Sequence, residues 1–150
     1  MLKKTMFLSI SIIILAIVII YSPAYAEEKG WKKSIKLPSG EVVCDLNGLW
    51  NYEFNGRGEL RTSGWSGGTV TDAIEITQEG SFFKGVRLRG NQFGEKGQVA
   101  VEGEMDKNGI KRMHHQLYGR TNGSFKAELS KDGNSIEIND PNFTVELSRK

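Results

Sequence analysis

Apolar and polar residues alternate along most of the chain after residue 45. Successive side chains of a strand point to opposite faces, so a two-residue period is typical of strands with one buried face. The alternation predicts eight strands, at residues 50–54, 74–77, 82–89, 99–105, 110–118, 125–129, 136–138 and 143–147. Because no segment after residue 45 has a helical period of useful length, the sequence predicts an all-β domain over residues 45–150.

Turn signals separate most of these strands. They are Glu79-Gly80, Asn108-Gly109, Asn122-Gly123 and Asp132-Gly133, with Asp140-Pro141-Asn142 before the last strand. Asn-Gly and Asp-Gly tolerate the positive φ angles of tight hairpins, so the strands should form an antiparallel up-and-down meander. An open meander would expose two edges and one apolar face, so we expect a single eight-stranded barrel. A sandwich of two sheets is the alternative.

Two of the strands have an ambiguous period. The strand at 82–89 offers two inward sets: Phe83, Gly85 and Arg87, or Phe82, Lys84 and Val86. The strand at 110–118 offers Met113 and His115, or His114 and Tyr118. A bulge would reconcile either choice with its neighbours.

The first 26 residues have the pattern of a secretory signal peptide. Lys3 and Lys4 precede an apolar run at residues 7–21, and Ala24 and Ala26 occupy the positions that a signal peptidase reads. The run has about 15 residues whereas a spanning helix needs roughly 20, which favours cleavage over an uncleaved membrane anchor. We therefore expect an exported protein, periplasmic or extracellular, with a flexible leader at residues 27–44.

Loss of the signal peptide changes the net charge. The chain has 20 Lys and Arg against 18 Asp and Glu, and residues 1–26 hold two of the Lys and no acid, so the mature chain is neutral. Nucleic-acid binders carry a clustered basic surface, and proteins held on anionic membranes carry a polybasic patch. The sequence therefore predicts no nucleic-acid partner and a mature domain that is not embedded in a membrane.

Few residues offer candidate chemistry. Cys44 is the single cysteine, so we expect it to be buried; an intermolecular disulfide or a reactive thiol is the alternative. His114 and His115 are adjacent and would point to opposite faces of a strand, so they cannot bind one metal ion together. With no nucleophile motif and no convergent pair of acids, the sequence favours a non-enzymatic protein without metal or cofactor.

Two segments at the ends of the expected barrel carry a family resemblance. Gly48-Leu49-Trp50 opens the first strand, and Leu147-Ser148-Arg149 closes the last. This combination resembles the lipocalins of the calycin superfamily, and more closely the small bacterial lipocalin-like and avidin-like barrels. In that family the tryptophan of a G-x-W segment plugs the closed end, and a basic residue of the last strand packs across its ring. The resemblance implies barrel closure through Gly48, Trp50 and Arg149.

The resemblance also implies an open mouth with a lid. The loop at residues 56–69 joins the first two strands, where lipocalins carry such a lid, and Trp65 would be its large apolar side chain. The inward phase predicts a pocket with apolar walls and few polar anchors. Its expected residues are Trp50, Tyr52, Phe54, Met113, His115, Tyr118, Phe125 and Phe143.

Three functions are compatible with these features. The first is the binding of a small hydrophobic ligand in the barrel. The second is a protein-interaction module of the cell envelope that uses the leader or the 56–69 loop, as barrels that inhibit proteases or lysozymes do. The third is a stable envelope domain with a filled core. The chain departs from true lipocalins in its short length, in the lack of a C-terminal helix and in the lack of the later motifs and disulfides, and small barrels of this kind often have filled interiors.

Overall fold

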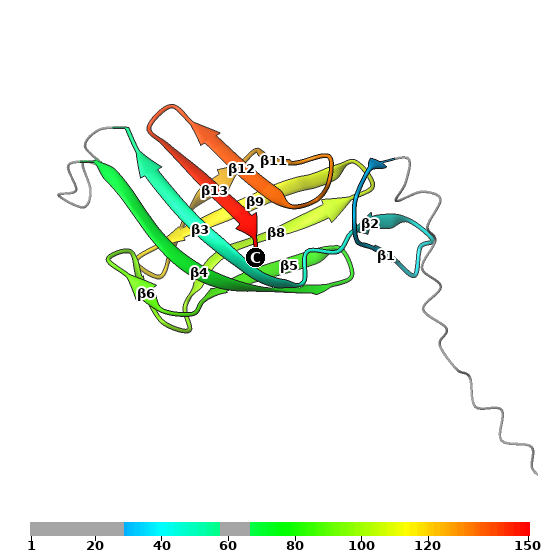
Figure 1. Ribbon diagram of the computed structural model, residues 1–150, viewed down its shortest axis with the longest axis horizontal. Coiled ribbons are helices and arrows are strands. Elements are labelled where there is room, and N and C mark those ends of the chain that lie inside the picture. Colours follow the sequence, from blue (N-terminus) through cyan, green and yellow to red (C-terminus); the bar gives the residue numbers. More distant parts are fainter. Residues whose placement is uncertain (1–28, 58–66) are drawn as a thin grey trace, which may run out of the picture.

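Strands form the regular structure of the chain in the computed structural model, which describes residues 29–57 and 67–150 (Figure 1). This confirms the all-β class. The strands are β1 (Ser34–Lys36), β2 (Val42–Cys44), β3 (Gly48–Gly56), β4 (Gly68–Glu79), β5 (Phe82–Arg87), β6 (Gly90–Asn91), β7 (Gly94–Glu95), β8 (Val99–Asp106), β9 (Gly109–Leu117), β10 (Arg120–Phe125), β11 (Ala127–Leu129), β12 (Ser135–Asp140) and β13 (Phe143–Arg149).

Nine of these strands form one antiparallel sheet in the order β10-β9-β8-β5-β4-β3-β13-β12-β11. Apart from the inserted hairpin β6–β7, neighbours in the sheet are neighbours in the chain, except that the last strand, β13, pairs with β3. The sheet is strongly curled and forms a half-barrel (Figure 1). The antiparallel meander is therefore as the turn signals predict.

The two edges of the sheet lie close together in the chain. β10 and β11 are separated by Lys126 alone, so the sheet has to bend round on itself, and β11 lies beside β9. One strand was expected at residues 125–129. The structure instead divides this region between β10, which pairs with β9, and β11, which pairs with β12. The described ladder therefore has nine strands and two ends, where the sequence predicts eight strands in a closed ring.

Both ambiguous strands have one clear inward face. β5 buries Phe83, Gly85 and Arg87, and β9 buries Met113 and His115. The register shifts between Gly85 and Val86 on β5, where β8 carries one extra residue. Such a bulge reconciles the alternation of the two strands.

The described part of the expected leader, residues 29–44, contains a β-hairpin. β1 and β2 pair with each other at one end of the half-barrel (Figure 1). Trp31, Val43 and Cys44 are buried, and the backbone N–H of Lys32 donates to the carbonyl oxygen of Asp132. The three buried side chains belong to the hydrophobic core at this end of the half-barrel.

A contact between arginine and tryptophan joins the first strand of the sheet to the last. The guanidinium carbon of Arg149 lies 4.6 Å from the centroid of the Trp50 ring. Arg149 also donates hydrogen bonds to the carbonyl oxygens of Asn47, at 2.8 Å, and Asp45, at 2.5 Å. The indole N–H of Trp50 donates to the carbonyl oxygen of Leu46 at 2.9 Å. One cation thus binds the ring and the segment that leads into β3.

Gly48 allows the chain to turn into β3 beneath this arginine. Its φ is +126°, a conformation that glycine adopts without steric cost. Just before it, the carboxylate of Asp45 accepts a hydrogen bond from the backbone N–H of Asn47 at 2.9 Å. The turn therefore has its own local support, and it brings the Asn47 carbonyl within reach of Arg149.

We expect Arg149→Ala to lower the free energy of unfolding by about 2 kcal/mol, because it removes a cation–π contact and two hydrogen bonds from a charged donor. Urea unfolding followed by circular dichroism measures the change. Lys150→Ala alters the exposed neighbouring cation and should stay within about 0.5 kcal/mol of the parent protein. Equal stabilities for the two variants would contradict this role of Arg149.

Candidate functional site

Four polar side chains from four strands lie in the interior of the half-barrel. Tyr52 is on β3, Asp72 on β4, Arg87 on β5 and His115 on β9, and each has 2% or less of its surface exposed. Strand register brings them together, because Tyr52 pairs with Asp72 across β3 and β4. Charged residues are almost never fully buried unless they are paired. This interior polar cluster is therefore the most unusual feature of the core.

The four side chains of the cluster form a chain of contacts that runs from His115 through Tyr52 and Arg87 to Asp72. The hydroxyl of Tyr52 and Nε2 of His115 are 2.7 Å apart and share a hydrogen bond. The guanidinium carbon of Arg87 lies 5.0 Å from the centroid of the Tyr52 ring, which is within cation–π range. Nη1 of Arg87 and Oδ2 of Asp72 form an ion pair at 3.5 Å, and Nη2 of Arg87 donates to the carbonyl oxygen of Gln116 at 3.3 Å.

The cluster leaves hydrogen-bonding capacity unused. Within the described ranges, Oδ2 of Asp72, Nη1 of Arg87 and Nδ1 of His115 are buried and have no hydrogen-bond partner. An unsatisfied buried polar group costs roughly 1–3 kcal/mol, and more when it is charged. Oδ2 of Asp72 and Nη1 of Arg87 face each other in the ion pair, and Oδ1 of Asp72 lies 3.8 Å from Nε of the exposed Arg89. Nδ1 of His115 is therefore the atom of the cluster that calls for an explanation.

Burial sets the protonation states of two members. Burial raises the pKa of Tyr52 to about 12, although the nearby Arg87 opposes the shift. Burial and then the positive charge of Arg87 lower the pKa of His115 to about 3. Both groups are therefore neutral at neutral pH. If the Tyr52 hydroxyl donates to Nε2, the ring proton of His115 lies on Nδ1, which then is a buried donor without an acceptor.

Aromatic rings surround His115 and fill the space beside the cluster. The ring of Phe54 stacks on His115 with centroids 5.6 Å apart, and it stacks on Phe143 at 5.3 Å. Phe125 meets Phe143 edge-on at 5.2 Å. Trp50, Phe54 and Met113 have no exposed surface, so the interior around these residues is filled by side chains.

The structure places most of the predicted pocket residues in this interior. Those that are buried there are Trp50, Tyr52, Phe54, Met113, His115 and Phe143. Phe125 is half-buried against the core, and the predicted lid residue Trp65 lies outside the described residues.

Tyr118 does not line the interior, contrary to prediction, and 51% of its surface is exposed. It follows the last residue of β9 and has a φ of 53°, which ends the alternation of inward and outward side chains there. Its ring meets the edge of Phe93 instead, with centroids 5.7 Å apart.

Three residues that matter to the cluster are missing from the predicted pocket. Arg87 belongs to one of the two inward sets that the sequence offers for its strand. Neither of these sets is part of the predicted pocket. Asp72 lies before the expected start of the second strand, which the structure extends back to Gly68. Phe93 lies in the segment between β6 and β7, which carries no alternation that could have indicated its burial.

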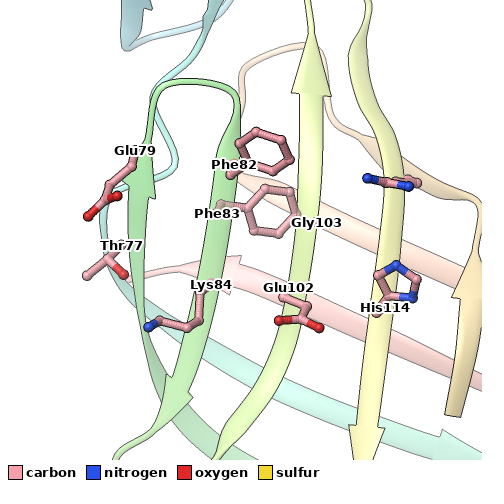
Figure 2. Close-up of a pocket in the computed structure, with 9 residues that line it drawn as sticks. Thr77, Glu79, Phe82, Phe83, Lys84, Glu102, Gly103 and His114 are labelled. Atoms are coloured by element: carbon pink, nitrogen blue, oxygen red, sulfur yellow. The ribbon is translucent and has the colours of Figure 1, made fainter. Parts of the chain in front are cut away.

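A hollow lies on the outer face of the sheet (Figure 2). Its volume is about 430 Å³, and its lining residues come from β4, β5, β8 and β9. Cross-strand pairing places Thr77, Lys84, Glu102 and His114 in one row and Glu79, Phe82, Glu104 and Arg112 in the next. Phe82 has 58% of its surface exposed, whereas its neighbour Phe83 is buried in the core and pairs with Gly103 across β5 and β8; both phenylalanines are labelled in Figure 2. This outer groove combines one exposed aromatic ring with charges of both signs.

Other kinds of site find little support in the described chain. Among residues 29–57 and 67–150, no three His, Cys, Asp or Glu side chains are grouped in a way that could hold a metal ion. Over the same ranges, no helix has the length and apolar character needed to cross a membrane. Cys44 is a buried free thiol whose pKa burial raises to about 12, so it is not a thiolate at neutral pH.

Comparison with known proteins gives no relative: no protein-family model matches the chain, and no curated protein or solved structure is significantly similar to it.

His115 predicts a loss of stability in mild acid. Its pKa is about 3 in the folded protein against an ordinary 6.5, so between these values the unfolded chain binds a proton that the folded chain does not. The contribution of neutral His115 to the free energy of unfolding is complete above pH 6.5. It decreases as the pH falls, by up to about 1.4 kcal/mol per pH unit. Tyr52 shares a hydrogen bond with the His115 ring, and the charge of Arg87 lowers the pKa of that ring. Asp72 forms an ion pair with Arg87.

We expect His115→Gln to remove this slope, which urea unfolding at pH 7, 6 and 5 measures. His114→Gln changes the adjacent residue on the outer row and should keep the slope of the parent protein. An unchanged slope in His115→Gln would show that another group causes the acid sensitivity.

Proposed function

We propose that this protein is a non-enzymatic, exported binding domain that holds a small, mainly apolar molecule inside its half-barrel. The observation that carries the proposal is the interior polar cluster, in which an ion pair of Asp72 and Arg87 is buried and, within the described residues, Nδ1 of His115 has no hydrogen-bond partner. A pocket with apolar walls and a few convergent polar groups is the usual form of a small-molecule site. Tyr52, Arg87 and Asp72 are the polar anchors, and the rings of Phe54 and Phe143 are the apolar walls.

Stability alone does not account for the cluster. Replacing a buried ion pair by well-packed apolar residues is often neutral or stabilising. A barrel with only a structural role would gain by burying aliphatic side chains at Asp72 and Arg87. Groups that are buried, polar and perturbed in pKa are found preferentially at functional sites.

The half-barrel can enclose such a site. β11 lies beside β9, and the two edges of the sheet are one residue apart in the chain. Arg149 packs on the ring of Trp50 where the chain enters β3. We therefore propose that the wall surrounds its interior as a closed barrel does, which agrees with the lipocalin-like interpretation of Gly48, Trp50 and Arg149. Export rests on the signal-peptide pattern of residues 1–26.

The double variant Asp72→Leu/Arg87→Met separates binding from stability. We expect its free energy of unfolding to equal or exceed that of the parent protein. We expect its Kd for the fluorescent apolar amine N-phenylnaphthylamine to rise about tenfold, because one hydrogen bond to a charged group is lost. Fluorescence titration measures the affinity, and native mass spectrometry of protein from its own host shows whether a small molecule is bound.

The matched control is Glu104→Leu/Arg112→Met, which makes the same chemical changes in an ion pair of the outer face whose atoms are 3.3 Å apart. It should leave the affinity for the probe unchanged. Absence of probe binding in the parent protein, or equal Kd values in the two double variants, would contradict an interior site.

The outer groove favours protein interaction as a second candidate function. Its rows carry charges of both signs, so a uniformly charged nucleic acid or membrane gains little there, whereas a polypeptide segment offers both donors and acceptors. Phe82 provides an aromatic anchor of the kind that dominates protein interfaces. The described part of the leader is packed against the core, so we assign this role to the groove instead.

We expect a photo-activated cross-linker placed at Thr77 in the groove to capture an envelope protein, and Phe82→Ser to reduce that capture at least tenfold. Leu49→Ser is the matched control, because Leu49 is similarly exposed, at 48%, on β3. Capture that is equal from Thr77 and from a linker on β3, or that survives Phe82→Ser, would exclude the groove as the interface.

A further inference from the structure

The segment between β5 and β8 stands apart from the main sheet. It contains β6 and β7, two strands of two residues each that pair with each other in a separate sheet. At its base, the N–H of Arg87 donates to the carbonyl of Gln98, and the N–H of Gly97 donates to the carbonyl of Arg87. Gly90 and Gly97 have φ values of +88° and +87° near its two ends. The N–H of Leu88 also donates to the carbonyl of Ala73 on β4. These bonds lie at the base of the hairpin, and glycines lie where it would pivot.

Phe93 inserts from the tip of this hairpin into the aromatic interior. It has no exposed surface, and its ring meets Phe54 edge-on with centroids 5.0 Å apart. Phe54 in turn stacks on His115 of the polar cluster. Phe93 thus occupies space beside the apolar wall of the proposed site. Its backbone carbonyl accepts a hydrogen bond from the N–H of Tyr118 at 2.5 Å.

The hairpin also covers the charged end of the cluster. A Cβ on Gly94 would lie 2.8 Å from Nε of Arg87 and 2.9 Å from Oε1 of Gln98. Only a residue without a side chain fits between the hairpin and the guanidinium group. The carboxamide oxygen of Gln98 accepts a hydrogen bond from the N–H of Glu95, which ties the hairpin to this position.

From these contacts we infer that the β6–β7 hairpin is the gate of the interior site, and that Phe93 holds the place which the apolar part of a ligand takes. The inference rests on the proposed small-molecule function. Binding withdraws Phe93, breaks its hydrogen bond with Tyr118 and uncovers Arg87. The closed state predominates without ligand, so the apparent affinity is lower than the intrinsic affinity by the fraction of open molecules.

Stopped-flow binding of N-phenylnaphthylamine to the purified protein tests the gate. Phe93→Ala should raise the association rate and lower Kd by about tenfold, since the competing side chain is removed. Phe93→Leu should lie between Phe93→Ala and the parent protein. Gln92→Ala changes an exposed residue of the same hairpin and should have no effect.

Hydrogen exchange on the parent protein gives a test without mutation. Saturating probe should speed exchange at the Tyr118 amide at least tenfold, because that amide loses its acceptor on Phe93. The parent protein, Phe93→Leu and Phe93→Ala could bind the probe with equal rates and Kd values while binding still depends on Asp72 and Arg87. That result would overturn the gate and leave the interior site standing. Slower exchange at Tyr118 would also overturn the gate. Absence of binding in all variants would overturn both.

Discussion

Pairing of the last strand with the first is the constraint on which the rest of the structure depends. β13 pairs with β3 along its whole length, from Phe143 opposite Gly56 to Arg149 opposite Trp50. A meander paired only between chain neighbours could remain flat, whereas this additional ladder forces the sheet to curl. Curling gives the sheet an inner face. The side chains of the remaining strands then point either to this inner face or to solvent. The position of Arg149 over Trp50 fixes the end of that ladder, because a slip of one residue would turn each of these side chains to the opposite face.

The interior combines two requirements that oppose each other. Close packing of Phe54, Phe143 and Met113 stabilises the fold through burial of apolar surface. The ion pair of Asp72 and Arg87 and the hydrogen bond of Tyr52 with His115 place polar groups in the same low-dielectric space, where each unsatisfied atom is costly. The hairpin at β6–β7 separates this space from solvent. This combination of a buried polar cluster and a covering hairpin is the basis on which we propose recognition of a molecule.

The sequence predicts the parts of this structure that depend on local pattern. The alternation at 50–54 and 143–147 identifies β3 and β13, and Gly48, Trp50 and Arg149 could be singled out because they belong to short motifs. Which strands pair with each other depends on residues far apart in the chain. The division of residues 125–129 between β10 and β11 at Lys126 therefore has no local signal in the sequence. The hairpin β1–β2 escaped prediction because strands of three residues are too short to show a period. Tyr52 and His115 follow from their phase, but the approach of Asp72 to Arg87 depends on strand register, and Phe93 is buried from a turn.

The ordered N-terminal hairpin has a consequence for how the chain folds. Lys32 bonds to Asp132 through the backbone, and Gly133 lies against Cys44 and Trp31, so the cap of the half-barrel joins segments about a hundred residues apart. Contacts of such long sequence separation form slowly, since much of the chain has to be ordered before they are made. The cap therefore cannot be complete before residues 132 and 133 are in place, and the β3–β13 ladder cannot form before residues 143–149 are available.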